Sequence, residues 1–200
     1  DKYVIRLKIP DNGKIIFYDQ VRDKVSINCT EIDDQVLIKT DGFPTYHLAV
    51  VVDDHQMKIS HTFRGEDWLS SLPRHVQLYR ALGWQAPYFA HLPNILAKDK
   101  SKLSKRHGAT SILEFRKMGY LPEALINFLS LLGWSLDDKT EIISRDDLVT
   151  NFDIMRVNKA SAVFDVDKLR WMNGYYIRQL GNEGIVDALM DYWLKYPPEQ

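Results

Sequence analysis

Residues 59–96 read ISHTFRGEDWLSSLPRHVQLYRALGWQAPYFAHLPNIL, and this stretch decides the fold. Ile59 to Phe63 is a short run rich in β-forming residues, and Tyr88 to Leu96 contains the next predicted strand. Between them, Ser70 or Ser71 can cap a helix that carries Pro73 in its first turn and stops at Gly83. The order strand, helix, strand predicts a parallel α/β sheet, which binds ligands at the carboxyl ends of its strands.

The residues before this stretch predict short strands and one helix. Apolar and polar residues alternate over 4–9, 14–18 and 35–39, as expected for half-buried strands. Thr45 can cap a helix from Tyr46 to about Met57. Periodicity leaves a buried strand open as the alternative for the middle of that helix.

The residues after this stretch predict helices only. Ser111 and Glu114 have the spacing of a capping box. Further helices are expected over 122–132, after a cap near Ser144, and over 164–177. Strands therefore stop at Leu121, and we place a domain boundary near Gly119.

Composition narrows the function classes. The 200 residues are 45% hydrophobic with a formal net charge of −1, so any nucleic-acid contact must come from a local basic patch. The single cysteine, Cys29, excludes an internal disulfide framework and a cysteine-rich zinc site in this sequence. No apolar run approaches the roughly 20 residues that span a bilayer. The sequence opens with Asp1 rather than methionine, which suggests a fragment.

A basic loop over residues 97–108 is the most informative motif. Its cations surround one acid, Asp99, and a serine stands between two lysines. Such a cluster is commonly a solvated surface. Here it follows a predicted strand and precedes a capped helix, so it also suits the phosphates of a nucleoside triphosphate. The cations are Lys98, Lys100, Lys102, Lys105 and Arg106.

The loop also carries a resemblance. Lys102 to Arg106 resembles the KMSKS signature of class I aminoacyl-tRNA synthetases, in the variant common among glutamyl enzymes. Other stretches look like the bacterial-type glutamyl-tRNA synthetase in order and spacing. They are residues 41–49, 51–55, 64–68, 82–84, 91–93 and 164–173.

The resemblance implies a fold and a domain organisation. It implies an α/β fold that is the C-terminal half of a Rossmann-like parallel sheet, followed by an all-α stem-contact region. Residues 1–34 would end the acceptor-stem-binding insertion. Residues 35–119 would form the second half of the nucleotide-binding fold, and residues 120–200 an incomplete tRNA-contacting junction domain. The family's HIGH signature is absent from these residues, so we expect the isolated chain to be unstable or to bind ATP weakly.

The resemblance also implies the glutamate-binding residues. Tyr46 and Arg64 would line the glutamate pocket, where a guanidinium suits a carboxylate. By residue type alone, Tyr46 would be a half-buried aromatic and Arg64 a surface ion pair with Glu66 or Asp67. Val50 stands where many relatives have a small polar residue, which would leave that side of the pocket drier.

The ATP site follows in the same way. Lys102 and Lys105 would be the catalytic cations. Asp67 would lie on the ribose side of ATP and Ile95 on the adenine side. The predicted triphosphate contacts are Lys102, Leu103, Ser104, Lys105 and Arg106. We predict no metal ligands, because the acids and histidine of residues 53–55 more commonly cap, pair or are solvated.

The function implied is a glutamate–tRNA ligase. It would activate L-glutamate with ATP and Mg²⁺ and transfer it to tRNA(Glu), with tRNA(Gln) as an open second substrate. We expect a cytoplasmic monomer without membrane contact. Two alternatives stay open. One is the related stand-alone enzyme that glutamylates a modified tRNA base, which lacks the helices after Gly119. The other is a non-catalytic RNA-binding module, in which Tyr46 and Arg64 have no reason to approach the basic loop.

Overall fold

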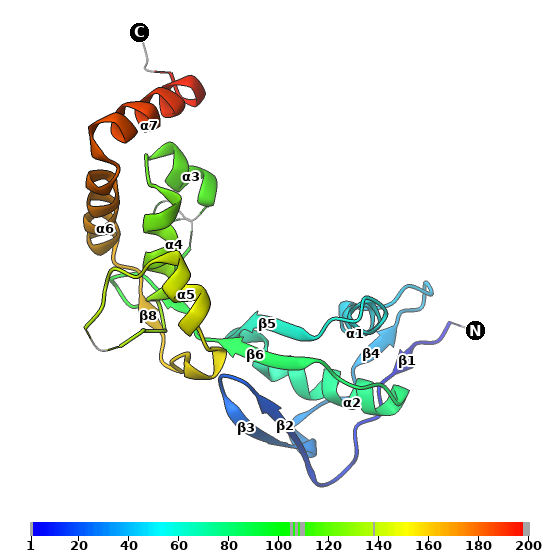
Figure 1. The fold of residues 1–200 in the computed structure, drawn as a ribbon. Helices are drawn as coiled ribbons and strands as arrows, with labels where there is room; N and C mark the ends of the chain where they lie inside the picture. Colours follow the sequence, from blue (N-terminus) through cyan, green and yellow to red (C-terminus); the bar gives the residue numbers. More distant parts are fainter. Residues whose placement is uncertain (1, 105, 107, 109–110, 138, 198–200) are drawn as a thin grey trace. The chain divides into compact units, whose positions relative to one another are not determined.

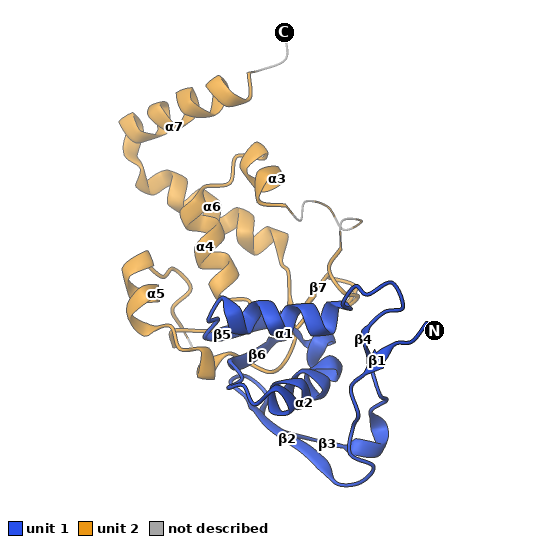
Figure 2. Ribbon diagram, turned by 90° about the vertical axis from the view of Figure 1, so that its right-hand side faces the viewer, with its two compact units in different colours: residues 1–92 blue, residues 93–200 orange. Residues whose placement is uncertain are grey.

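The computed structural model describes residues 2–197 except 105, 107, 109–110 and 138. The chain forms two compact units, residues 1–92 and 93–200 (Figure 2). This division falls earlier than the boundary predicted near Gly119, because residues 95–103 pair and pack with the second unit. The three functional domains stay a prediction.

The first unit is built on a four-stranded sheet with the order β3-β2-β6-β5. β2 and β3 form an antiparallel hairpin, whereas β6 is parallel to both β2 and β5. The parallel strand, helix, strand unit predicted from residues 59–96 is therefore present (Figure 1). The strands are β2 Lys14–Asp19, β3 Asp23–Asn28, β5 His61–Gly65 and β6 Tyr88–Leu92. A second, antiparallel pair consists of β1 Ile5–Arg6 and β4 Val36–Ile38, shorter than the runs predicted there.

One helix packs on this sheet and a second packs on that helix. α1, Tyr46–Gln56, is a helix and not the alternative strand, and it packs against α2, Leu72–Leu82. Gly83 ends α2 with a left-handed backbone, as its position predicts. The residues before α2 form an unpredicted 3₁₀ helix, η2 Glu66–Ser71. The shared core includes Ile15, Phe17, Val51, Leu72, Val76, Tyr79 and Phe89.

Much of the other face of the sheet is exposed, although Ala90 on that face is buried. Side chains alternate along a strand, so the neighbours of buried Ile15 and Phe17 point away from α2. The exposed residues of that face include Ile16, Tyr18, Phe63 and Tyr88. β5 is an edge strand, so its outer side has no strand partner among the described residues.

The second unit is mostly helical (Figure 1). The capping box predicted at Ser111 is present, and its Oγ accepts the backbone N–H of Leu113. Its main core consists of aromatic and aliphatic side chains from several helices and from the segment after β8, including Phe115, Phe128, Phe164, Leu169 and Met172. The helices are α3 Ile112–Lys117, α4 Pro122–Ser130, α5 Arg145–Asn151, α6 Val166–Gln179 and α7 Gly181–Lys195.

Two features of this unit differ from expectation. Strands do not stop at Leu121, because β8 Ala162–Val163 pairs in parallel with β7 Ile95–Leu96. Phe164, the residue after β8, is buried, and the backbone N–H of Phe164 donates to the Leu96 carbonyl at 2.8 Å. These contacts hold the segment beside β7. The sequence also did not predict α7, whose glycines at 181 and 184 are poor helix formers. No helix in the described part of the chain is long and apolar enough for a membrane span.

Candidate functional site

Arg64 lies near the carboxyl end of β5 and rests against two aromatic rings. Its guanidinium carbon is 5.8 Å from the ring centroid of Tyr46 and 5.5 Å from that of Trp68. The two ring centroids are themselves 5.2 Å apart. Tyr46 opens α1 and Trp68 lies in η2, so three elements converge on one guanidinium. Cation–π contacts of this kind fix the plane of an arginine and leave its N–H groups at the edge.

The ion pairs considered for Arg64 are not formed. The carboxylate of Glu66 instead meets Arg22, with 2.6 Å between Oε2 and Nη2. Among the described residues, no carboxylate oxygen lies within 4.0 Å of the Arg64 guanidinium, so Arg64 forms no ion pair with them. Arg64 is half-buried, so its charge is only partly hydrated. A guanidinium in this state is suited to a carboxylate brought by a ligand.

Two histidines near Arg64 join α1 to α2: His47 lies on α1 and His75 on α2. Nδ1 of His47 is 2.9 Å from Nε2 of His75, so one of the two rings donates to the other. Burial, and then the charge of Arg64, lowers the pKa of His75 to about 3. Burial, followed by the charges of Arg74 and Arg64, also lowers the pKa of His47. Both rings are therefore neutral at pH 7 and add no cation beside Arg64.

Val50 and Asp67 complete the predicted positions in the first unit. Val50 is half-buried and packs against the core of this unit, consistent with a dry wall. Asp67 is exposed in η2, directly before Trp68. The described residues contain no group of three or more His, Cys, Asp or Glu side chains that could hold a metal ion.

The basic loop in the second unit begins as a tight hairpin. The backbone N–H of Ala97 donates to the Ser101 carbonyl at 2.8 Å, and that of Leu103 donates to Ile95 at 2.9 Å. Asp99 holds the turn, since its Oδ1 accepts from both the backbone N–H and the hydroxyl of Ser101 at 2.9 and 2.7 Å. The one acid of the loop thus holds the turn that precedes Lys102.

The described cations after the turn are exposed. Lys102 and Arg106 are exposed, and together with Leu103 and Ser104 they line an open hollow. Lys98, before the turn, forms an ion pair of 2.6 Å with Asp167 of α6. Lys105, the predicted main contact to the phosphates, lies outside the described residues.

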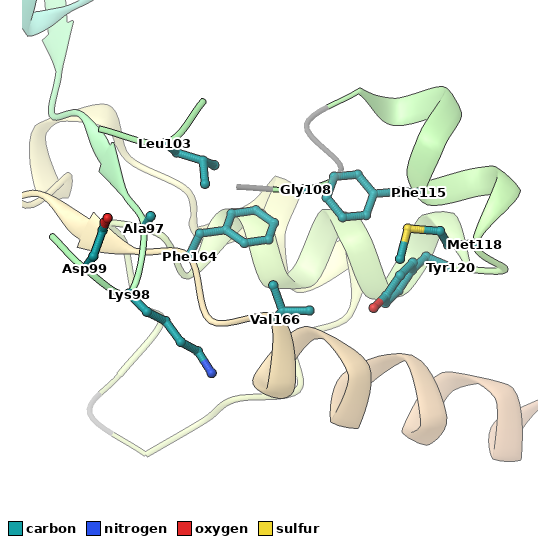
Figure 3. A pocket seen from close by; sticks show the side chains of 10 residues that line it. All are labelled: Ala97, Lys98, Asp99, Leu103, Gly108, Phe115, Met118, Tyr120, Phe164 and Val166. Atoms are coloured by element: carbon teal, nitrogen blue, oxygen red, sulfur yellow. The ribbon is translucent and has the colours of Figure 1, made fainter. Parts of the chain in front are cut away.

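A separate, mainly apolar cavity of about 450 Å³ lies beside the hairpin. Figure 3 shows Leu103, Phe164 and Val166 turned toward it, with Phe115, Met118 and Tyr120 on its other side. Ile95 packs against the same hydrophobic cluster. Its side chain is half-buried, so its predicted contact with adenine stays a prediction.

Comparison with known proteins shows what these two regions belong to. Residues 1–171 match the family model described as tRNA synthetases class I (E and Q), catalytic domain. The chain belongs to this family. The resemblance seen in the sequence is therefore confirmed, and so is the α/β fold class with parallel strands.

Relatives and solved structures agree with the family model. The glutamate–tRNA ligase of Alkaliphilus metalliredigens is 54% identical over 195 residues, which cover 98% of this chain and 40% of that protein. That of Clostridioides difficile is 51% identical over 193 residues, 96% and 39% of the two chains. A crystal structure of the Elizabethkingia meningosepticum glutamate tRNA ligase in complex with its amino acid superimposes with a TM-score of 0.87 at 43% identity. It matches all of this chain and 43% of the other, so this chain spans about 40% of the length of its relatives.

Within the family, the structure brings together two predicted residues, Tyr46 and Arg64, and adds one that sequence reasoning did not assign. Trp68 is 41% exposed, and it lies on Arg64 and close to Tyr46. Sequence reasoning could not assign it, because its approach to Arg64 depends on the course of the 3₁₀ helix η2.

Proposed function

We propose that this chain is part of a glutamate–tRNA ligase that activates L-glutamate with ATP and transfers it to tRNA(Glu). The observation that carries the proposal is Arg64, a half-buried guanidinium braced by Tyr46 and Trp68. Family membership and relatives named glutamate–tRNA ligase support it.

The chemistry assigned to these residues is positioning and charge stabilisation. Arg64 and Tyr46 hold glutamate while its α-carboxylate attacks the α-phosphorus of ATP, forming a carboxyl–phosphate bond. The bond between the α- and β-phosphates breaks, and pyrophosphate carries the electron pair away. Lys102 and Lys105 stabilise the charge that develops on the phosphates, and the residues of 102–106 bind the triphosphate. Mg²⁺ bound to ATP would supply positive charge that partly neutralises the phosphates.

Asp67 and Ile95 are the remaining predicted ATP contacts, on the ribose and adenine sides. Use of tRNA(Gln), a monomeric state and a cytoplasmic location belong to the same proposal. The helices after Gly119 distinguish it from the stand-alone enzyme that modifies a tRNA base. The bracing of Arg64 favours it over an RNA-binding module, since such a module has no need for a guanidinium held between two aromatic rings.

The test is charging by the complete enzyme that contains this chain, with purified tRNA(Glu) and tRNA(Gln). Wild type is compared with Arg64→Ala and Lys105→Ala. We expect glutamate charging by wild type and loss of most of that rate in both variants. Failure of wild type to charge either tRNA rejects the proposed function. Normal charging by both variants rejects the site instead.

A further inference from the structure

A network of polar side chains joins the carboxyl ends of β2 and β6 in the first unit. Asp19 and His91 are 2% and 1% exposed, and Asp19 Oδ2 lies 2.6 Å from His91 Nδ1. Asp19 Oδ1 accepts the backbone N–H groups of Val21 at 3.0 Å, Arg22 at 2.9 Å and His91 at 3.1 Å. Burial by itself would raise the pKa of Asp19, but these hydrogen bonds hold the pKa below its ordinary value. Asp19 is therefore an ionised hub that fixes the turn after β2.

Arg22 extends this network toward η2. Its Nε donates to the His91 carbonyl at 3.2 Å, and its Nη2 meets Oε2 of Glu66 at 2.6 Å. The side chains of Arg22 and Glu66 are 17% and 28% exposed, so solvent screens this pair less than an exposed one. Charge-assisted hydrogen bonds in partly buried positions are among the stronger polar contacts of a protein.

Glu66 is the first residue of η2, the segment that carries Asp67 and Trp68. Gly65, the residue before it, provides no side chain to cap the segment. The contact with Arg22 thus fixes the start of η2. A shift there would move Asp67 and Trp68 together, because both follow within one turn.

We propose that Arg22 and Glu66, supported by Asp19 and His91, are positioning residues that set η2 and thereby the binding of both small substrates. The proposal rests on the proposed function, in which Asp67 meets ATP and Trp68 braces the glutamate-binding Arg64. It adds a role for four residues to which the sequence analysis assigned no part in substrate binding. They touch no substrate and act through Asp67 and Trp68.

The experiment measures charging kinetics of the complete enzyme with Arg22→Met, Glu66→Gln and the exchanged pair Arg22→Glu/Glu66→Arg. We expect the KM values for ATP and glutamate to rise about tenfold in each single variant, with kcat and the KM for tRNA within about twofold of wild type. The exchanged pair should recover part of this loss. The control is Lys39→Met, which removes an exposed ion pair of 3.2 Å with Asp41 and should leave all constants unchanged.

A merely structural role predicts another pattern. It lowers the fraction of active enzyme, and so kcat, without a selective rise in the two KM values. Wild-type KM values for ATP and glutamate in Glu66→Gln overturn the proposal, as does an equal rise of all three KM values. If Arg22→Met does not fold, Glu66→Gln decides, because it keeps the size and removes only the charge.

Failure of the proposed function remains distinguishable. If wild type charges no tRNA, amide hydrogen exchange over residues 66–71 decides the positioning role by itself. Faster exchange there in Glu66→Gln than in Lys39→Met supports the network, and equal exchange overturns it.

Discussion

The Arg64 site and the basic loop use cations in different ways. Arg64 is half-buried, and two rings from separate elements brace it, above a pair of neutral histidines. The described cations that line the hollow of the basic loop, Lys102 and Arg106, are exposed beyond a hairpin that Asp99 holds. A carboxylate has a fixed shape, so a prepared guanidinium suits it. Phosphates that change during a reaction are better followed by flexible lysines.

The largest expected effect tests the prepared guanidinium. Arg64→Lys keeps the charge but removes the planar fork and its stacking on Tyr46 and Trp68. We expect kcat/KM for glutamate in the complete enzyme to fall about 100-fold or more, which corresponds to about 3 kcal/mol. Steady-state charging at varied glutamate measures it. A loss below about threefold would mean that a positive charge at position 64 suffices to bind glutamate. The Arg64 site would then use its cation in the same way as the basic loop.

The next effect concerns pH and the core behind Arg64. The pKa of His75 is lowered to about 3 in the folded state, so the unfolded state binds more protons between pH 3 and the ordinary value of 6.5. The contribution of neutral His75 to the stability of the folded state is therefore complete above pH 6.5 and is lost as the pH falls. From pH 7 to pH 5, the opening free energy of α1 and α2 should drop by about 2 kcal/mol.

Amide hydrogen exchange of α1 and α2 at the two pH values, corrected for intrinsic rates, measures this drop. His75→Gln should flatten it, because the titrating ring is gone. His47, whose pKa is also lowered, contributes with the same sign. The hairpin over residues 95–103 contains no histidine and should not share the pH dependence. An equal drop there would show that the whole enzyme, rather than this core, responds to acid.

The brace itself gives a smaller effect. Trp68→Ala removes one of the two rings and leaves Arg64 in contact with Tyr46 alone. We expect the KM for glutamate to rise about tenfold, or about 1.4 kcal/mol, since a partly desolvated cation–π contact has that size. Trp68→Phe should recover most of it. If alanine and phenylalanine behave alike, stacking does not orient the guanidinium.

How far the sequence predicts the molecule depends on the kind of signal. Local signals placed several helix ends: Gly83 ends α2, the Ser111 capping box starts α3, and the Pro73 region starts a helix. The predicted caps Thr45 and Ser71 precede their helices but form no side-chain capping hydrogen bond. Signals that depend on tertiary pairing were not. β8 is two residues long, and its only reason to be a strand is the partner β7, 67 positions earlier by the register Ile95↔Ala162. α7 lacked a local start signal.

The candidate site divides in the same way. Chemistry and motif together predicted Tyr46 and Arg64, and the structure places them in contact. Trp68 and the Arg22–Glu66 pair could be assigned only once the path of η2 was known, and no periodicity in the sequence predicts η2. A sequence therefore indicates which residue types a ligand needs more readily than it indicates which neighbours hold them.

The smallest effect belongs to the turn of the basic loop. Lys100 has a left-handed backbone with φ of 64°, a conformation that glycine adopts without steric cost. Lys100→Gly should stabilise the turn by roughly 0.5 kcal/mol and so slow hydrogen exchange of the Ser101 amide. Lys100→Val should destabilise the turn by about 1 kcal/mol and so speed that exchange. Charging should stay within about twofold of wild type for both, because the assigned phosphate contacts begin at Lys102. If Lys100→Gly slows exchange of the Ser101 amide but charging falls strongly, the ammonium of Lys100 itself binds substrate. The cations that bind phosphate would then include one within the turn as well as those that follow it.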